Sequence, residues 1–261
     1  MFRELINTLS VWQLFLINLV VLLSVSVLAT YIASHFISKK SVNKEYSRST
    51  DSILNIMGSG YGVFLGFVII TLWNHYLYVQ KNVYKEADDI SVVVRDLNAI
   101  PEKDRRPLEN SLKQYLHLLR TDEWSMMRKG QESEQTWNAM RTMLITFQQY
   151  TPKTPKEVLF YRQIMTHMDS FLQGRRDRLI TIHSILNDEL RTALILGAIV
   201  IVFLSSLLKA HEGGTMRIVA NFCLALVIGF NLTLALSFDY PFSGSIAVSK
   251  APFYEGMLKN F

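Results

Sequence analysis

Long apolar runs alternate with mixed segments along the chain, and these runs determine its class. Val11 to Ser34, Met57 to Tyr78, Thr192 to Leu208 and Ile218 to Phe238 contain no aspartate, glutamate, lysine or arginine. About 20 apolar residues suffice for a helix to cross roughly 30 Å of hydrocarbon. The first run is too long for the apolar part of a secretory signal, and it lacks a small-residue cleavage site. The sequence therefore predicts an all-α, polytopic membrane protein with four transmembrane helices in the lipid bilayer.

Charged and apolar residues at helical spacing fill the stretch between the second and third runs. This pattern predicts a helical extramembrane domain, because three apolar stripes imply a bundle. The stripes are Leu108, Leu112, Tyr115, Leu116 and Leu119; Trp137, Met140, Leu144 and Phe147; and Val158, Tyr161, Met165, Met168 and Leu172. The predicted layout is transmembrane helices 1 and 2 in residues 11–79, the helical domain in 80–190, transmembrane helices 3 and 4 in 191–238, and a tail in 239–261.

A continuous helix is expected at each junction between the membrane and this domain. No helix breaker lies between Thr71 and Asn98, so the second span is expected to continue into the domain as one helix. The helix that starts near Lys156 is likewise expected to run past Gly174 into the third span. Such helices would couple the domain rigidly to the membrane.

The formal net charge of +5 is modest, and the basic residues lie beside the spans or among acids. Nucleic-acid binding is not predicted, because the chain has no basic stripe or binding motif. The short loop 37–52 holds Lys39, Lys40, Lys44 and Arg48, and the loop 209–217 holds Lys209 and Arg217. Basic short loops stay in the cytoplasm. The helical domain and both termini are therefore expected on the outer side.

Small residues recur every four positions in the second span, where Gly58, Gly62 and Gly66 share one helical face. Such spacing lets two helices approach closely, and helix packing is its favoured interpretation. The alternative is that this helix lines a pore. The candidate pore-lining or packing residues are Gly58, Tyr61, Gly62, Phe64, Gly66 and Asn74. No carboxylate or lysine lies within the spans, which argues against a proton-coupled pump but leaves a passive channel open.

Charged residues of opposite sign flank the membrane on two different helices of the domain. They are Glu86, Asp88 and Asp89 after the second span, and Arg175, Arg176 and Arg178 before the third. Their heights above the membrane overlap in part, which allows ion pairs. The favoured interpretation is solvated helix faces, where a pair contributes less than about 1 kcal/mol.

Catalytic and metal-binding patterns are absent from the sequence. The six histidines are scattered, the single cysteine, Cys223, lies inside the fourth run, and no phosphate loop or nucleophile elbow occurs. We therefore expect no enzyme activity, no cofactor and no metal site.

The order of these features resembles the bacterial bestrophin-like membrane protein family, whose function is unknown. The resemblance rests on the glycine-rich stretch from Gly62 to Phe67, then Trp73, Glu86-Ala87, Tyr115, Glu123-Trp124, Arg175 to Leu179, and the closing segment from Phe238 to Ile246. It implies four spans per subunit around a shared axis, in a homo-oligomeric ion channel, with an anion as the permeant species, in the bacterial inner membrane. Bestrophin channels carry their helical domain in the cytoplasm, opposite to the charge-based expectation. The alternative function is a non-conducting scaffold or signalling protein whose helical domain binds a partner.

The closing segment also predicts a turn at Asp239, Pro241, Phe242 and Gly244. Proline cannot continue the fourth helix, and glycine permits the turn. This turn is expected to act as an anchor that folds the tail against the membrane surface.

Overall fold

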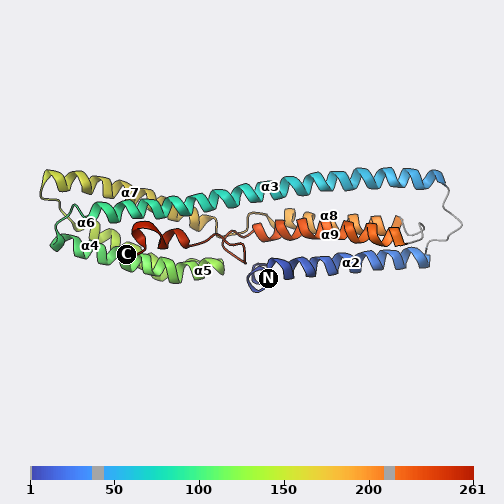
Figure 1. Cartoon of the computed structure of the whole chain (residues 1–261), viewed down its shortest axis with the longest axis horizontal. Coiled ribbons are helices and arrows are strands. Elements are labelled where there is room, and N and C mark those ends of the chain that lie inside the picture. Colours follow the sequence, from blue (N-terminus) through green and yellow to red (C-terminus); the bar gives the residue numbers. More distant parts are fainter. Residues whose placement is uncertain (1, 37–43, 209–214) are drawn as a thin grey trace. The chain divides into compact units, whose positions relative to one another are not determined.

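The computed structural model describes residues 2–36, 44–208 and 215–261, which are mainly helical (Figure 1). The predicted loop residues Lys39, Lys40 and Lys209 lie outside the described residues. The chain divides into two compact units, which are described separately. The membrane unit comprises Met1–Asn74, Ser184–Asp239 and Gly244–Ile246. The helical unit comprises His75–His183, Tyr240–Ser243 and Ala247–Phe261.

Four helices are long and apolar enough to cross a membrane, which confirms the prediction from the apolar runs. They are α2 (Val11–Phe36), α3 (Lys44–Leu97), α8 (Asp188–Leu208) and α9 (Thr215–Phe238). As predicted, α3 is a single helix that contributes residues to both units.

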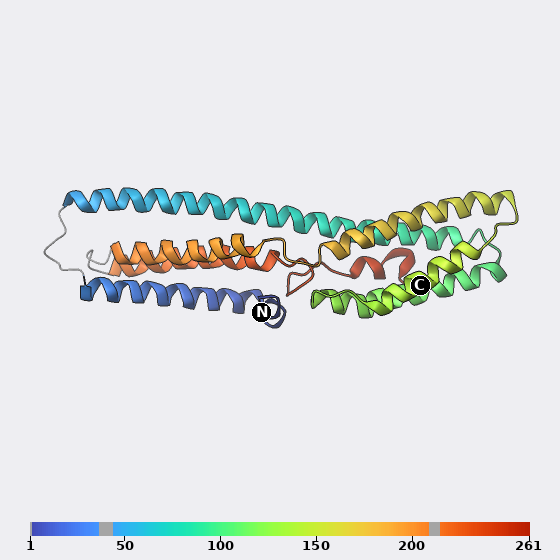
Figure 2. The ribbon, with the colours of Figure 1, turned by 180° about the vertical axis from the view of Figure 1, so that it is seen from behind.

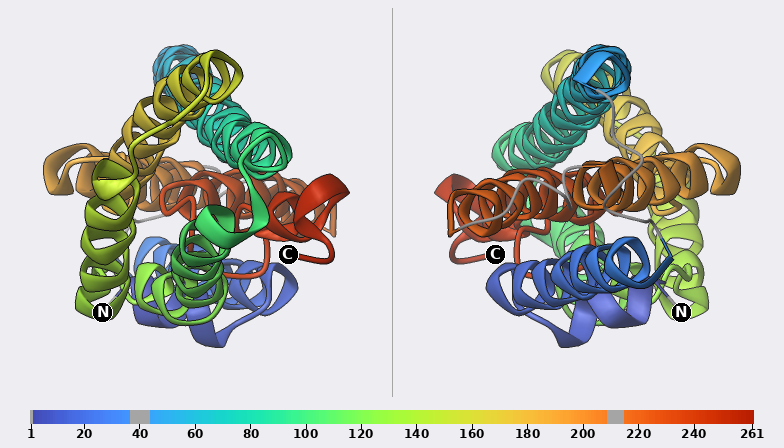
Figure 3. Two further views of the ribbon diagram at one scale, coloured as in Figure 1. Left: turned by 90° about the vertical axis from the view of Figure 1, so that its left-hand side faces the viewer. Right: turned by 90° about the vertical axis from the view of Figure 1, so that its right-hand side faces the viewer.

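The membrane unit is built in layers. Helix α2 packs against α8 and α9, and α3 lies on the opposite side of the α8–α9 pair (Figure 3). Two polar contacts fix the packing: Asn18 Nδ2 donates to Thr233 Oγ1 at 2.8 Å, and the buried hydroxyls of Ser26 and Ser206 lie 2.7 Å apart. Each contact provides a polar partner between helices in hydrocarbon, and the Thr233 hydroxyl that accepts from Asn18 donates in turn to the Gly229 carbonyl oxygen at 2.7 Å.

The helical unit combines the later part of α3 with several shorter helices. These are α4 (Glu102–Leu118), the π-helix η1 (Leu119–Glu123), α5 (Trp124–Arg128), α6 (Glu134–Gln149) and α7 (Pro155–Ile180). Helix α7 lies along α3, as the view from behind shows (Figure 2). Side-chain caps explain two helix starts: Ser133 accepts from the N–H of Thr136, and Thr154 accepts from that of Glu157.

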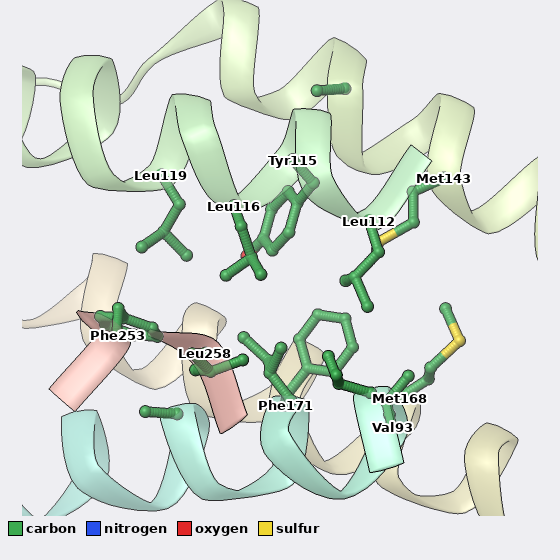
Figure 4. Close-up of a cluster of buried hydrophobic side chains, with 14 of the residues drawn as sticks. Val93, Leu112, Tyr115, Leu116, Leu119, Met143, Met168, Phe171, Phe253 and Leu258 are labelled. Carbon is green, nitrogen blue, oxygen red and sulfur yellow. The ribbon is translucent and has the colours of Figure 1, made fainter. Parts of the chain in front are cut away.

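The first predicted stripe is correct, because all five of its residues are buried in the core of the helical unit (Figure 4). The second and third are partly wrong. Helix α6 buries Ala139, Met143 and Phe147, and α7 buries Ile164, Met168 and Phe171. Val158 is exposed, whereas Trp137 and Met140 lie beside the guanidinium of Arg175. The faces are therefore rotated by about one residue from those predicted.

Helix α7 does pass Gly174, but it does not run into the third span as expected. It ends at Ile180, and α8 begins at Asp188. Within the membrane unit, the Asp239 carboxylate accepts hydrogen bonds from Ser184 Oγ at 2.9 Å and from the Leu186 N–H at 2.7 Å. These bonds stabilise an irregular segment that contains neither proline nor glycine.

The end of the tail belongs to the core of the helical unit. Its two 3₁₀ segments, η3 (Ala251–Tyr254) and η4 (Gly256–Leu258), bury Phe253 and Leu258 completely. Arg120 of η1 donates to both of their carbonyl oxygens, with 2.9 Å from Nε to the oxygen of Phe253 and 2.7 Å from Nη2 to that of Leu258.

Candidate functional site

One face of α3 in the membrane unit is unoccupied by the rest of its own subunit. A Cβ atom placed on Gly58, Gly62 or Gly66 would meet no heavy atom of the described residues within 4 Å. Apolar side chains flank these glycines, and Val63 and Phe67 are 60% and 66% exposed. Gly58 is half-buried and lines a hollow of about 420 Å³ with Ile201 of α8 and Asn221 of α9, so it faces its own subunit. We call the exposed surface from Gly62 to Asn74 the outward face of α3.

The aromatic candidates Tyr61 and Phe64 point the other way. The Tyr61 hydroxyl donates to the Leu194 carbonyl oxygen at 2.8 Å. Its ring covers Gly197 of α8, where an added Cβ would lie only 2.5 Å from Cε2 of Tyr61. Phe64 is half-buried and packs against the core of the membrane unit. These two residues therefore hold α3 to its own subunit, whereas Gly62 and Asn74 are exposed on α3.

A cluster of four buried charges lies inside the helical unit. Arg178 forms a fork with Glu86, with 2.7 Å from Nε to Oε2 and 2.9 Å from Nη2 to Oε1. Its Nη2 also donates to Glu123 Oε1 at 2.7 Å, and Glu123 in turn pairs with Arg175. All four side chains are at most 1% exposed. We call Glu86, Glu123, Arg175 and Arg178 the buried charge cluster.

Sulfur and aromatic groups complete the surroundings of the two arginines. Arg175 lies 4.2 Å from the ring centre of Trp137, and Arg178 lies 5.3 Å from that of Trp124. Arg178 Nη1 is 2.8 Å from the sulfur of Met127. Such contacts suit guanidinium groups that are removed from water.

The cluster is electrically balanced, with two carboxylates and two guanidinium groups. Burial alone would raise the pKa of Glu123, but the charges of Arg178 and Arg175 and their hydrogen bonds outweigh it and lower this pKa. Burial would lower the pKa of Arg178, yet Glu86 and Glu123 raise it. Burial, reinforced by the two glutamates, raises the pKa of Tyr115 well above its usual value. Burial raises the pKa of Glu86, although Arg178 opposes it. The arrangement thus favours a charged Arg178 and a neutral tyrosine.

The six charged candidates have different environments. Glu86, Arg175 and Arg178 are buried in ion pairs, so the solvated interpretation is wrong for them. Asp89 is also buried, and its carboxylate contacts His167 Nδ1 at 2.8 Å and Ser170 Oγ at 2.6 Å. Only Asp88 and Arg176 are exposed, as solvated faces would be.

Sequence reasoning missed Glu123 as a member of the cluster. It stands at the end of the π-helix η1, which follows α4 without a break. Single π turns inside α-helices often mark functional positions. The available signal was its place in the Glu123-Trp124 pair, which supported the family resemblance without indicating an ion pair.

The predicted tail turn is formed by contacts in each unit. In the membrane unit, Asp239 is fully buried and binds Arg191 at 3.0 Å from Nε and 2.8 Å from Nη2. Gly244 has φ +81°, and its N–H donates to Asn7 Oδ1 of the short helix α1 (Phe2–Thr8) at 3.0 Å. Nothing in the sequence singled out Arg191, which precedes the third apolar run by one residue.

In the helical unit, the same turn contributes Pro241 and Phe242, both of which are buried. The ring of Phe242 packs edge-on against Trp124, with centroids 5.7 Å apart. The Pro241 carbonyl oxygen accepts from the Val248 N–H at 2.8 Å. These contacts hold the turn in the helical unit, and its docking against the membrane surface stays a prediction.

Metal ligands are not gathered in the part of the chain that the structure describes, where no group of three or more His, Cys, Asp or Glu side chains could hold an ion. Cys223 is exposed on α9. The buried charge cluster is closed to solvent and internally paired, so its geometry serves positioning and not ligand capture.

Four apolar helices and a separate helical unit define the class: this is a polytopic α-helical membrane protein. The sequence model of the Bestrophin-like domain matches residues 20–253, which is most of the chain. The protein therefore belongs to the Bestrophin-like family, as the resemblance implied. No curated protein matches the chain, and no solved structure does.

Proposed function

We propose that this protein is a homo-oligomeric, anion-permeable channel of a bacterial inner membrane, in which the outward face of α3 borders the pore. The observation that carries the proposal is this face itself: a Cβ added at Gly62 would meet no described heavy atom within 4 Å, and Val63 and Phe67 are exposed. Glycines at four-residue spacing favour close approach of a second helix or a narrow passage. Membership of the Bestrophin-like family supports the same function.

The chemistry of this face suits a passive pathway without fixed charge. Met57 to Tyr78 contains no ionised side chain of Asp, Glu, Lys or Arg. Aromatic ring edges carry partial positive charge, and apolar constrictions gate by dewetting. Phe67 is the most exposed aromatic residue of this face and is the residue that we expect at the constriction.

Ion flux through the purified protein in liposomes tests the proposal. We expect chloride flux to exceed potassium flux and Phe67→Ala to change the chloride flux. The matched control is Leu196→Ala, which removes another exposed apolar side chain, 54% exposed, from a different helix, α8. Equal effects of both variants would remove α3 from the pore. Absence of flux from correctly inserted protein, over a range of pH and calcium, would favour the scaffold function instead.

The side of the membrane is a separate part of the proposal. We place the loops 37–52 and 209–217 in the cytoplasm, because their basic residues follow the positive-inside rule. The exposed Lys103 of the helical unit can be replaced by cysteine in a Cys223→Ser background. Labelling of Lys103→Cys by an impermeant maleimide in intact spheroplasts is expected. Labelling only after lysis would reverse the orientation and leave the channel proposal standing.

A further inference from the structure

The hollow that Gly58 lines, of about 420 Å³, lies between α3, α8 and α9, entirely within the membrane unit. It is near the end of α8 and the start of α9. All three helices contribute polar side chains to its lining: Asn55 and Ser59 of α3, Ser205 of α8 and Asn221 of α9. Asn55 and Ser59 are exposed, so the described residues leave the space open beside α3. We call this space the polar hollow.

Two of these polar side chains are buried and lack partners. Ser205 and Asn221 are only 6% and 7% exposed, yet neither side chain forms a hydrogen bond with any residue that the structure describes. The neighbouring Ser206 differs, because its hydroxyl lies 2.7 Å from that of Ser26. An asparagine amide offers two donors and an acceptor oxygen, and a serine hydroxyl can donate and accept. Unpaired groups of this kind are unfavourable away from water, so they indicate an occupant that forms hydrogen bonds.

The lining of the polar hollow carries no charge. None of its nine residues is acidic or basic. Arg217, one turn before Asn221, lines a different hollow and has an interaction of its own. The partial charges at the end of α8 and the start of α9 have opposite signs and offset each other. An ion in this space would lose hydration without meeting a counter-charge, so the lining favours an uncharged ligand.

We propose that the polar hollow is a binding site for water and other small uncharged molecules that form hydrogen bonds. A buried water molecule needs about two to four polar partners, and the four polar side chains supply them. Each water occupies about 30 Å³ in the liquid, so the volume holds several. Lipid acyl chains would leave Ser205 and Asn221 unpaired, which is unfavourable in hydrocarbon. The proposal does not depend on ion conduction, because the site lies within one subunit.

Thiol modification of Ser205→Cys, in a Cys223→Ser background of the full chain in lipid nanodiscs, provides the test. Only the thiolate reacts, so modification requires water at the site. Three methanethiosulfonates of similar size are compared: hydroxyethyl, sulfonatoethyl and trimethylammonioethyl. Relative to their rates at Lys103→Cys, the uncharged reagent should react about tenfold faster than either ion, because the lining offers no counter-charge. The matched control is Ser206→Cys, whose site is 0% exposed and does not line the polar hollow; it should react about tenfold more slowly than Ser205→Cys.

A second variant tests the polar lining itself. Asn221→Leu keeps the size of the side chain and removes its hydrogen-bonding groups, so it should slow modification of Ser205→Cys about tenfold by drying the hollow. The same replacement at the exposed Asn110 of the helical unit should leave that rate unchanged.

Four results would overturn the proposal. Equal rates at Ser205→Cys and Ser206→Cys would show that the hollow is dry. Charged reagents as fast as the uncharged one, relative to Lys103→Cys, would show that it admits ions. An unchanged rate in Asn221→Leu would show that the amide holds no water. Protection of Ser205→Cys by added diacylglycerol would assign the space to the hydroxyl of a neutral lipid.

Discussion

Removing the guanidinium of Arg178 is expected to weaken the helical unit more than any exposed substitution. Arg178 is 0% exposed and binds both carboxylates of the buried charge cluster. Arg178→Met would leave Glu86, also 0% exposed, without a cation that contacts it directly. Breaking a buried ion pair in this way costs about 3–5 kcal/mol, because the remaining charge stays buried.

Hydrogen exchange measured by mass spectrometry on the full chain in detergent checks this value locally. Each 1.36 kcal/mol corresponds to a factor of ten, so α7 amides that exchange through unfolding of the helical unit should exchange roughly 150 to 5,000 times faster. The matched control is Arg106→Met, which breaks an exposed pair with Glu102 and should change exchange by less than about fivefold.

The double variant Glu86→Leu with Arg178→Met decides whether the pairing itself matters. It removes one charge of each sign and leaves Arg175 paired with Glu123. We expect the double variant to be more stable than Arg178→Met alone, because no unpaired carboxylate remains. A double variant no more stable than the single one would refute the reasoning.

Two further predictions concern pH and the tail turn. Glu123 and Glu157 have lowered pKa values, the latter chiefly through the Lys153 N–H and the Tyr150 hydroxyl. Their stabilisation is complete above the ordinary glutamate pKa of about 4.3 and is lost as the pH falls through the lowered values. Burial raises the pKa of Glu86, so its contribution has the opposite sign. The prediction is therefore made for Glu157 alone: the difference in unfolding midpoint between the protein and Glu157→Gln should be level from about pH 7 to 5 and then shrink, and a difference that grows in acid would contradict this. Gly244→Ala combines a left-handed backbone (φ +81°) with a Cβ only 2.6 Å from Cγ2 of Ile6, whereas Gly256→Ala has φ +54° and nothing within 4 Å. Both variants should lose about 1–2 kcal/mol of stability through backbone strain. Gly244→Ala should lose more in thermal unfolding, because its added Cβ also clashes with Ile6. Equal losses would show that the turn and α1 can move apart without loss of stability.

The transmembrane architecture could be predicted because its signal is local. An apolar run of about 20 residues identifies a span without any knowledge of its neighbours. The continuity of α3 could be predicted in the same way, because it required only that no helix breaker interrupt the second span.

Features that depend on distant partners could not be predicted in the same way. Arg175 and Glu123 are 52 residues apart, and only the packing of α7 beside η1 reveals that they pair. The end of α7 depends on hydrogen bonds from the segment after it to Asp239, 55 residues beyond Ser184. The register of α6 was misjudged because Trp137 and Met140 serve a buried cation, which hydrophobicity alone does not distinguish from a core.

The direction in which the pore candidates point could not be predicted from the sequence either. Tyr61 and Phe64 lie within one turn of the glycines, and helical spacing alone does not say which face meets α8. The decisive feature is Gly197, whose missing side chain leaves room for the Tyr61 ring.

The π-helix η1 lets the helix from Glu102 to Arg128 hold one residue more than a regular α-helix between the same two ends. A π turn contains one residue more than an α turn, and each residue of an α-helix turns the chain by about 100°. Deletion of one residue between Leu119 and Glu123 would therefore give a regular α-helix in which Leu116 and Glu123 lie close to their present phase, whereas a regular α-helix of the present length would rotate one against the other. Related chains that are one residue shorter at this point should therefore keep the carboxylate and have an α turn in place of the π turn.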